Sequence, residues 1–345
     1  MTALEQITFN AYHLPQYRNT WKLSHIIETQ QFDIPTLFNI FALAKELKKT
    51  VNYGNCHYLE NIRVVSQFQE ASSRTKNSFE MATSFLGALL ASSTENALEF
   101  SSLVKGESQA DNFRMLNQLH PDIIIVRFKN TGDAKLAASV SQIPIINAGD
   151  GHGQHPTQAI LDVDTIYNEL GRLDNLNIGL VGDLRKGRTV RSLAYLMAKF
   201  KQNKIFFVSP PSLSVNEDIK DYLNRHHVVY SEHHNLLEVA KDLNVLYMTR
   251  IQKERGSEIT PNEQVSVSLT EAVKQILPTS AQDCIVMHPL PRGPEISPDF
   301  DQDPRAKYWK QVENGLFTRM AELLMISNPE KARYLVDNSK NMVLL

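Results

Sequence analysis

The chain contains only two cysteines, Cys56 and Cys284, which lie far apart in the sequence. Two thiols cannot form a four-cysteine zinc site, and a single pair gives little support for a disulfide-rich secreted fold. Long apolar runs are also missing: no stretch approaches the roughly 18 consecutive apolar residues of a membrane span, and residues 1–31 lack the apolar core of a signal peptide. These absences predict a cytoplasmic protein that has reduced thiols and no membrane segment.

An excess of one charge sign is missing as well, because 36 Lys and Arg nearly balance 38 Asp and Glu. The chain therefore has no overall field that would attract nucleic acid or an anionic membrane, and any anion must be bound locally. At 345 residues, a prior of about 150 residues per domain predicts two domains.

Short apolar runs alternate with helical patterns along most of the chain. Uninterrupted apolar strands between helices indicate parallel sheets covered on both faces, which bind ligands at the carboxyl ends of their strands. The predicted fold class is α/β, with two doubly wound domains, each with a mainly parallel sheet flanked by helices, and the active site between them. The expected strands lie at 64–65, 123–126, 144–146, 178–181, 205–208, 245–248 and 285–287, and the clearest helices at 34–47, 157–170 and 189–200.

The stretch from Phe68 to Phe79 reads as a strand end, a polar loop and a helix. An apolar face at Phe79, Ala82, Leu86 and Leu89 predicts that this helix is buried on one side. Its N-terminus offers backbone N–H groups and a positive dipole end to an anion. The loop adds hydroxyl donors and a guanidinium, which favours an oxyanion or phosphate site over an ordinary helix cap. These side chains are Ser72, Ser73, Arg74 and Thr75.

The glycine-rich segment 147–158 follows an expected strand and opens a helix. Its glycines do not form the Gly-x-Gly-x-x-Gly pattern, which argues against a dinucleotide site. His155 could donate a hydrogen bond to a substrate carbonyl, and Gln158 could orient an amide. A glycine-rich connection in which His155 only caps the helix is the equally weighted alternative.

Residues 182–189, Gly-Asp-Leu-Arg-Lys-Gly-Arg-Thr, nearly match a nucleotide-binding P-loop. Arg188 stands where that motif needs lysine, and no later strand ends in an acidic residue placed for Mg²⁺. Arginine instead favours planar carboxylate binding.

Two further polar segments follow expected strands. Arg250 and Gln252 lie on the same side of an extended strand end, where a solvated charge run is the default interpretation. Residues 288–292, His-Pro-Leu-Pro-Arg, form a rigid turn whose carbonyls could accept hydrogen bonds from an amine, or which is only a proline-locked turn. Residues 91–109, in contrast, are small and polar and predict a mobile surface loop.

In this order and spacing, the segments 68–79, 147–158, 181–188, 246–255 and 288–292 resemble the aspartate branch of the aspartate/ornithine carbamoyltransferase family, over residues 68–317. The resemblance implies transfer of a carbamoyl group from carbamoyl phosphate to L-aspartate in pyrimidine synthesis, without a metal or an organic cofactor. It also implies a carbamoyl-phosphate domain of residues 1–154 and 316–345, and an aspartate domain of residues 155–315.

The same resemblance implies a role for each candidate residue. Ser72, Ser73, Arg74 and Thr75 would hold the phosphate. Arg127, Thr75 and His155 would bind the carbonyl oxygen, and Gln158 the carbamoyl nitrogen. The aspartate ligands would be Arg188, Arg250, Gln252, the backbone of Pro289 and Leu290, and Lys105 from a neighbouring subunit. Ser101 and Lys105 would enter the site of a neighbouring subunit in a homotrimer, to which a separate regulatory chain could also bind. Glu70 and Arg255 would pair on domain closure.

Overall fold

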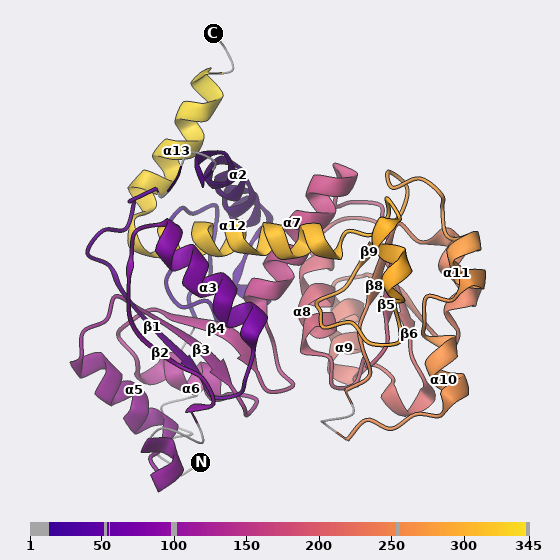
Figure 1. Ribbon diagram of the computed structural model, residues 1–345, viewed down its shortest axis with the longest axis horizontal. Coiled ribbons are helices and arrows are strands. Elements are labelled where there is room, and N and C mark those ends of the chain that lie inside the picture. Colours follow the sequence, from indigo (N-terminus) through magenta and orange to yellow (C-terminus); the bar gives the residue numbers. More distant parts are fainter. Residues whose placement is uncertain (1–13, 52–53, 55, 98–101, 253–255, 343–345) are drawn as a thin grey trace. The chain divides into compact units, whose positions relative to one another are not determined.

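The computed structural model describes residues 14–51, 54, 56–97, 102–252 and 256–342. The chain divides into two compact units, one comprising Met1–Thr157 and Gly315–Leu345 and the other Gln158–Asn314 (Figure 1). The chain crosses from one unit to the other within helix α7 (Pro156–Leu170) and returns within helix α12 (Tyr308–Ser327). None of the helices in the described ranges is long and apolar enough to cross a membrane.

Unit 1 is built on a four-stranded sheet of order β2-β1-β3-β4, in which every pairing is parallel. Helices α5 and α6 cover one face of the sheet, and α3 lies on the other (Figure 1). The central strands are buried, as their continuous apolar runs predict. The strands are β1 (Arg63–Phe68), β2 (Leu89–Thr94), β3 (Ile123–Phe128) and β4 (Ile145–Asp150), and the helices are η1 (Thr29–Gln31), α2 (Ile34–Val51), α3 (Ser73–Phe85), η2 (Ser102–Lys105), α5 (Gln109–Gln118) and α6 (Asp133–Val140).

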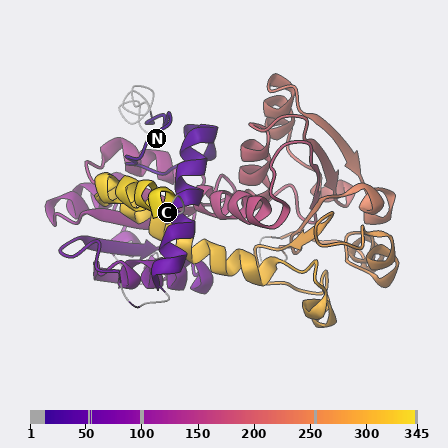
Figure 2. The same cartoon turned by 90° about the horizontal axis from the view of Figure 1, so that it is seen from above.

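Unit 2 is built on a five-stranded parallel sheet of order β7-β6-β5-β8-β9. Figures 1 and 2 show α8 and α9 on one face of this sheet and α10 and α11 on the other. The strands are β5 (Asn177–Val181), β6 (Lys204–Val208), β7 (Val229–His233), β8 (Val245–Met248) and β9 (Ile285–Met287). The helices are α8 (Arg188–Met197), η3 (Pro211–Leu213), α9 (Glu217–Arg225), η4 (Leu236–Glu238), η5 (Ala240–Asp242), α10 (Pro261–Ser266), α11 (Glu271–Ile276) and η7 (Pro298–Gln302).

The α/β architecture with two parallel sheets and flanking helices is the predicted fold class. One expectation was wrong: part of 91–109 is regular structure, because Leu89–Thr94 forms strand β2 and Ser102–Lys105 forms a 3-10 helix. Leu89 is 60% exposed and belongs to this strand, so it is not part of the buried helix face, whereas Phe79, Ala82 and Leu86 are fully buried. An edge strand is held by backbone hydrogen bonds to one neighbour and tolerates small polar side chains.

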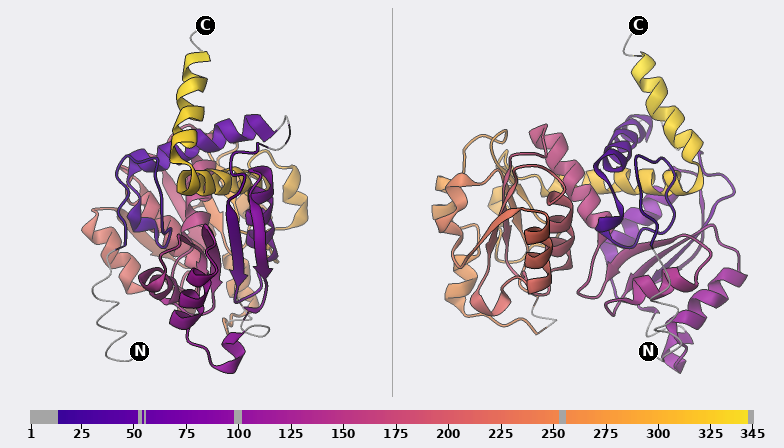
Figure 3. Two further views of the ribbon diagram at one scale, coloured as in Figure 1. Left: turned by 90° about the vertical axis from the view of Figure 1, so that its left-hand side faces the viewer. Right: turned by 180° about the vertical axis from the view of Figure 1, so that it is seen from behind.

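The chain after Ser327 continues as helix α13 (Pro329–Met342), which packs against α2 (Figure 3). Ala332 and Val336 are buried, and the Lys331 ammonium lies 4.7 Å from the centre of the Tyr58 ring. The segment that precedes the family resemblance is docked too: Ile26 pairs with Ile146 of β4 in an isolated parallel bridge.

Candidate active site

The phosphate-loop residues lie where β1 ends and α3 begins. Ser72 occupies the cap position of α3, but its side chain makes no cap hydrogen bond within the described part of the chain; its backbone N–H donates to Glu95 Oε1 at 3.0 Å instead. Thr75 is buried, whereas Ser73 and Arg74 are exposed. The geometry thus does not support an ordinary serine cap and keeps the donors of the loop at a helix N-terminus, where an anion is favoured.

Arg127 lies beside this loop, because β3 pairs with β1 in a register that places Arg127 opposite Phe68. Its guanidinium donates to Glu70 Oε1 at 3.0 Å from Nε and 2.9 Å from Nη2, and to the Ala148 carbonyl at 3.2 Å. The side chains of Arg127 and Glu70 are only 12% and 25% exposed. Arg127 is therefore already oriented by an anionic partner, for which an incoming oxyanion would compete. Arg255, the other expected partner of Glu70, lies outside the described residues.

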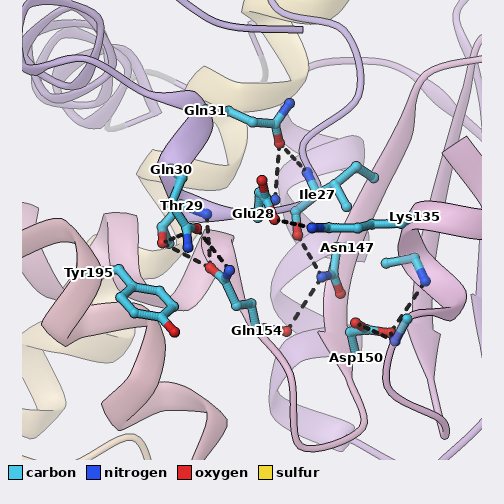
Figure 4. A network of polar contacts seen from close by, with 12 residues as sticks. Ile27, Glu28, Thr29, Gln30, Gln31, Lys135, Asn147, Asp150, Gln154 and Tyr195 are labelled. Atoms are coloured by element: carbon cyan, nitrogen blue, oxygen red, sulfur yellow. Dashed lines mark hydrogen bonds and ion pairs between the residues drawn. The ribbon is translucent and has the colours of Figure 1, made fainter. Parts of the chain in front are cut away.

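A network of amides holds the loop that follows β4 (Figure 4). Asn147 donates to the Ile27 carbonyl at 2.8 Å and accepts from the Gly149 N–H at 2.8 Å. Asp150 accepts from the N–H groups of Gly132 and Ala134 at the start of α6. Gln154 accepts from both the N–H and the hydroxyl of Thr29 and donates to Gln30. These bonds connect the glycine-rich loop to the N-terminal segment and fix the position of His155.

His155 directly precedes α7 and is 3% exposed. Its Nδ1 lies 3.4 Å from the Thr157 hydroxyl, both within unit 1. Lys105 ends η2 and is exposed, while Ser101 lies outside the described residues. Unit 1 thus brings together the phosphate loop and Arg127 on adjoining strands, with His155 after the neighbouring β4.

In unit 2, the near-P-loop segment folds onto itself around Asp183. This buried carboxylate accepts from the Lys186 N–H at 3.0 Å and from the Ser257 hydroxyl at 2.7 Å. Gly182 has a φ of +115°, and a Cβ there would lie 2.2 Å from the Thr249 carbonyl oxygen. The glycine is therefore needed for close approach of two strand ends, and Asp183, not a phosphate, takes the loop N–H.

Arg188 is the first residue of α8 and is 7% exposed. Arg250 and Gln252 follow β8, which pairs with β5 so that Val181 lies opposite Met248. The Gln252 N–H points to Asp183 at 3.4 Å. The three expected carboxylate ligands thus follow two adjacent strands of one sheet, and Asp183 connects their loops.

The turn after β9 is held by a buried hydrogen bond between His288 and Glu295. His288 Nε2 lies 2.9 Å from Glu295 Oε1, and His288 Nδ1 accepts from the Leu290 N–H at 2.8 Å. Burial alone would raise the pKa of Glu295, but the His288 ring and the Gly293 N–H bring that pKa below its ordinary value. The turn that carries Pro289 and Leu290 is therefore oriented through a neutral Nδ1 acceptor and an ionised Glu295.

Sequence reasoning missed the acids that orient these ligands. Asp183 lies inside the near-P-loop segment, whose pattern is defined by glycines and cations, and Asp162 lies one helical turn after Gln158. The i, i+4 spacing of Gln158 and Asp162 was the available signal, since such residues meet on one helix face.

Two family models match this chain, and they divide it in nearly the same way as the two units of the structure. Residues 24–168 match the family model of the aspartate/ornithine carbamoyltransferase carbamoyl-P binding domain, and residues 174–326 match that of the Asp/Orn binding domain. The chain is 46% identical over 307 residues to the chloroplastic aspartate carbamoyltransferase of Arabidopsis thaliana, covering 89% of this chain and 78% of that protein. With the rice enzyme of the same name it shares 45% identity over 311 residues, which is 88% of this chain and 85% of the relative.

Solved structures give the same result. The fold superimposes on aspartate transcarbamoylase of Trypanosoma cruzi in complex with carbamoyl aspartate and phosphate, with a TM-score of 0.82 and 36% identity over 89% of this chain and 96% of that chain. The same enzyme in complex with N-(phosphonacetyl)-L-aspartic acid gives a TM-score of 0.80 and 35% identity over 92% and 99% of the two chains. This chain belongs to the aspartate/ornithine carbamoyltransferase family.

Proposed function

We propose that this protein is an aspartate carbamoyltransferase, which transfers the carbamoyl group of carbamoyl phosphate to the amino group of L-aspartate. The observation that carries the proposal is the pair of arginines, Arg188 and Arg250, which follow the adjacent strands β5 and β8 of unit 2, the unit that matches the Asp/Orn binding domain. Two guanidinium groups suit a dicarboxylate, whereas the cationic side chain of ornithine would be repelled. The similar enzymes whose structures hold aspartate or its analogues support the same substrate.

In unit 1, the phosphate is held at the N-terminus of α3 by Ser72, Ser73, Arg74 and Thr75. Arg127, Thr75 and His155 donate to the carbonyl oxygen. In unit 2, Gln158 binds the carbamoyl nitrogen. Arg188, Arg250 and Gln252 bind the aspartate carboxylates, and the backbone of Pro289 and Leu290 positions the amine.

These ligands are sufficient for the chemistry. The neutral amine attacks the carbamoyl carbon, negative charge builds on the carbonyl oxygen, and the C–O bond to phosphate then breaks while the amine proton leaves with the phosphate. Preorganised donors stabilise both developing charges. Holding two small substrates in contact supplies much of the remaining rate enhancement. No side-chain nucleophile is required.

The first experiment measures the ureido product formed from carbamoyl phosphate with aspartate and, in parallel, with ornithine. We expect carbamoyl-aspartate alone. Arg74→Ala should remove phosphate affinity and lower turnover by about 100-fold or more, as expected for the loss of a charged donor from a developing oxyanion. Arg114→Ala, at an exposed arginine on α5, is the matched control and should keep the wild-type rate. An unchanged rate of Arg74→Ala at saturating carbamoyl phosphate would contradict the phosphate assignment.

Two rivals predict other results. A carbamoyltransferase for another amino acid would keep activity in Arg250→Ala with a non-acidic acceptor. A P-loop nucleotidase would show Mg-dependent nucleotide hydrolysis, although the Lys186 N–H of its loop already binds Asp183.

The quaternary and cellular parts of the proposal extend beyond one chain. The active unit is a homotrimer in which Ser101 and Lys105 enter the site of a neighbouring subunit. Within each chain, the domains divide near residues 154 and 316. The protein acts in the cytoplasm. Cell fractionation tests the cytoplasmic placement. A separate regulatory chain would appear as a second component in the purified assembly.

A further inference from the structure

The carboxylate of Asp162 is fully buried on α7, one turn after Gln158. Its Oδ1 accepts from Gln158 Nε2 at 2.8 Å and from Gln311 Nε2 at 2.6 Å, and its Oδ2 accepts from the Tyr247 hydroxyl at 2.8 Å. All of these residues belong to unit 2. Exposure is 9% for Gln158, 1% for Gln311 and 0% for Tyr247. One buried charge is thus held by donors from three separate segments.

The orientation of the amides follows from the donor and acceptor inventory. Gln311 Oε1 accepts from the His288 backbone N–H at 3.0 Å, and a backbone N–H can only donate. The Nε2 group of Gln311 must therefore face Asp162. Asp162 Oδ1 accepts from Gln311 Nε2, and Gln158 Nε2 donates to the same oxygen, so Gln158 Oε1 faces the opposite way.

This polarity matches the donor substrate of the proposed function, on which the inference rests. The carbamoyl group differs from an acetyl group by an N–H₂ in place of a methyl group, and N–H₂ needs an acceptor. We propose that Asp162 is a positioning residue that makes Gln158 present its carbonyl oxygen to the carbamoyl N–H₂, so that the site selects carbamoyl phosphate over acyl phosphates that lack this group.

The Asp162 carboxylate is also connected to the segments of unit 2 that are assigned to aspartate, the acceptor substrate. Tyr247, on β8, also receives a hydrogen bond from the side chain of Thr189, the neighbour of Arg188. Burial, and then the charge of Asp162, raise the pKa of Tyr247 well above its ordinary value. Through Gln311, Asp162 is connected to His288, which begins the turn with Pro289 and Leu290. Asp162 therefore connects the residue that reads the donor amide with two segments assigned to aspartate.

The first test compares carbamoyl phosphate with acetyl phosphate, by kcat/KM for the first and by competitive inhibition for the second. Discrimination here means the preference for carbamoyl phosphate over acetyl phosphate. Gln158→Ala removes the carbonyl oxygen that accepts from the carbamoyl N–H₂, and so gives the loss of discrimination expected when this hydrogen bond is absent. Asp162→Leu should lower the discrimination by about 10- to 100-fold, the cost of one buried hydrogen bond left unmade, and Gln158→Ala/Asp162→Leu should lower it no further. Asp162→Asn should restore most of it, because one oxygen can still receive both amides while its Nδ2 donates to Tyr247.

Asp164→Leu is the matched control, because Asp164 is 3% exposed and lies on the same helix. It should leave the discrimination unchanged if it folds. Full discrimination in folded Asp162→Leu, or an equal loss for both phosphates, overturns the inference. A wild-type protein that makes no carbamoyl-aspartate instead overturns the proposed function, so the two failures are distinguishable.

A second variant keeps the test decisive if Asp162→Leu does not fold. In Gln158→Glu, the new carboxyl would face ionised Asp162, and like charges at this distance raise the pKa of one partner. The protonated form would donate to Asp162 and keep a carbonyl oxygen for the substrate, so kcat/KM should fall as pH rises between about 6 and 9. Gln158→Glu/Asp162→Asn should lack this fall. A flat profile for Gln158→Glu overturns the inference.

Discussion

At the scale of single residues, Glu322 is a buried acid with a consequence for stability. It lies on α12 within unit 1, is 0% exposed, and neither carboxylate oxygen has a hydrogen-bond partner among the described residues. Burial raises its pKa from an ordinary 4.5 to about 8, although Arg319 nearby acts in the opposite direction. The folded protein therefore holds a neutral carboxylic acid at pH 7, where the unfolded chain holds a carboxylate.

The sign of the pH dependence follows from linkage. Between pH 4.5 and 8 the folded state binds the Glu322 proton and the unfolded state has lost it, so the contribution of Glu322 to stability is complete below pH 4.5 and is lost as pH rises to about 8. We predict that Glu322→Gln, which carries no charge, gains stability relative to wild type over this window by up to about 1.4 kcal/mol per pH unit. Unfolding measured at several pH values checks this. A difference that stays constant from pH 5 to 9 would contradict it.

The proposed substrate ligands and the residues that orient them differ in how far the sequence predicts them. The hydroxyl groups and the arginine of residues 72–75 are adjacent in the sequence and follow an expected strand, so the sequence alone indicates an anion site there. Asp162 and Asp183 are acids whose roles depend on partners distant in sequence, such as Gln311 and Ser257. Only the folded sheet brings those partners together.

At the scale of elements, buried parallel strands were predictable because they carry uninterrupted apolar runs. The edge strands β2 and β7 were not, since β2 is largely exposed and Val229 on β7 is 62% exposed. Their pairing comes from backbone groups of the inner strands, which leave no side-chain pattern.

The junction between β5 and α8 gives a prediction at this scale. Gly182→Ala would place a Cβ against the Thr249 carbonyl at 2.2 Å and separate the two strand ends that the proposed aspartate ligands follow. We expect a loss of about 2 kcal/mol or more in the free energy of unfolding, together with weaker aspartate binding. Gly171→Ala is the control: its φ is +68° but no atom lies within 4 Å, so only the backbone strain of about 1 kcal/mol remains. Equal losses in the two variants would refute the steric explanation.

At the scale of the whole molecule, the proposed homotrimer makes a prediction about mixed assemblies. If Lys105 acts in the neighbouring site, Lys105→Ala and Arg74→Ala chains are each defective alone, but a hybrid trimer contains a site with both residues intact. Co-expression should therefore restore part of the activity, in a species of about three times 39.1 kDa by sedimentation.

The control combines Arg74→Ala with Arg188→Ala. Both residues are assigned to one chain's own site, so no hybrid should regain activity. Recovery in this pairing, or none in the first, would contradict the shared-site arrangement.

The buried contacts of Asp162 also set a rule for redesign toward another amine. Arg250 and Gln252 follow a strand end and are the residues proposed to bind the aspartate carboxylates, so they are the positions to vary in a library. Tyr247 and Gln311 are not, because replacing either removes a donor from the carboxylate that orients Gln158. Mutations at Arg250 and Gln252 should therefore change the amine substrate without lowering the selectivity for carbamoyl phosphate, as long as Tyr247, three residues before Arg250, is kept.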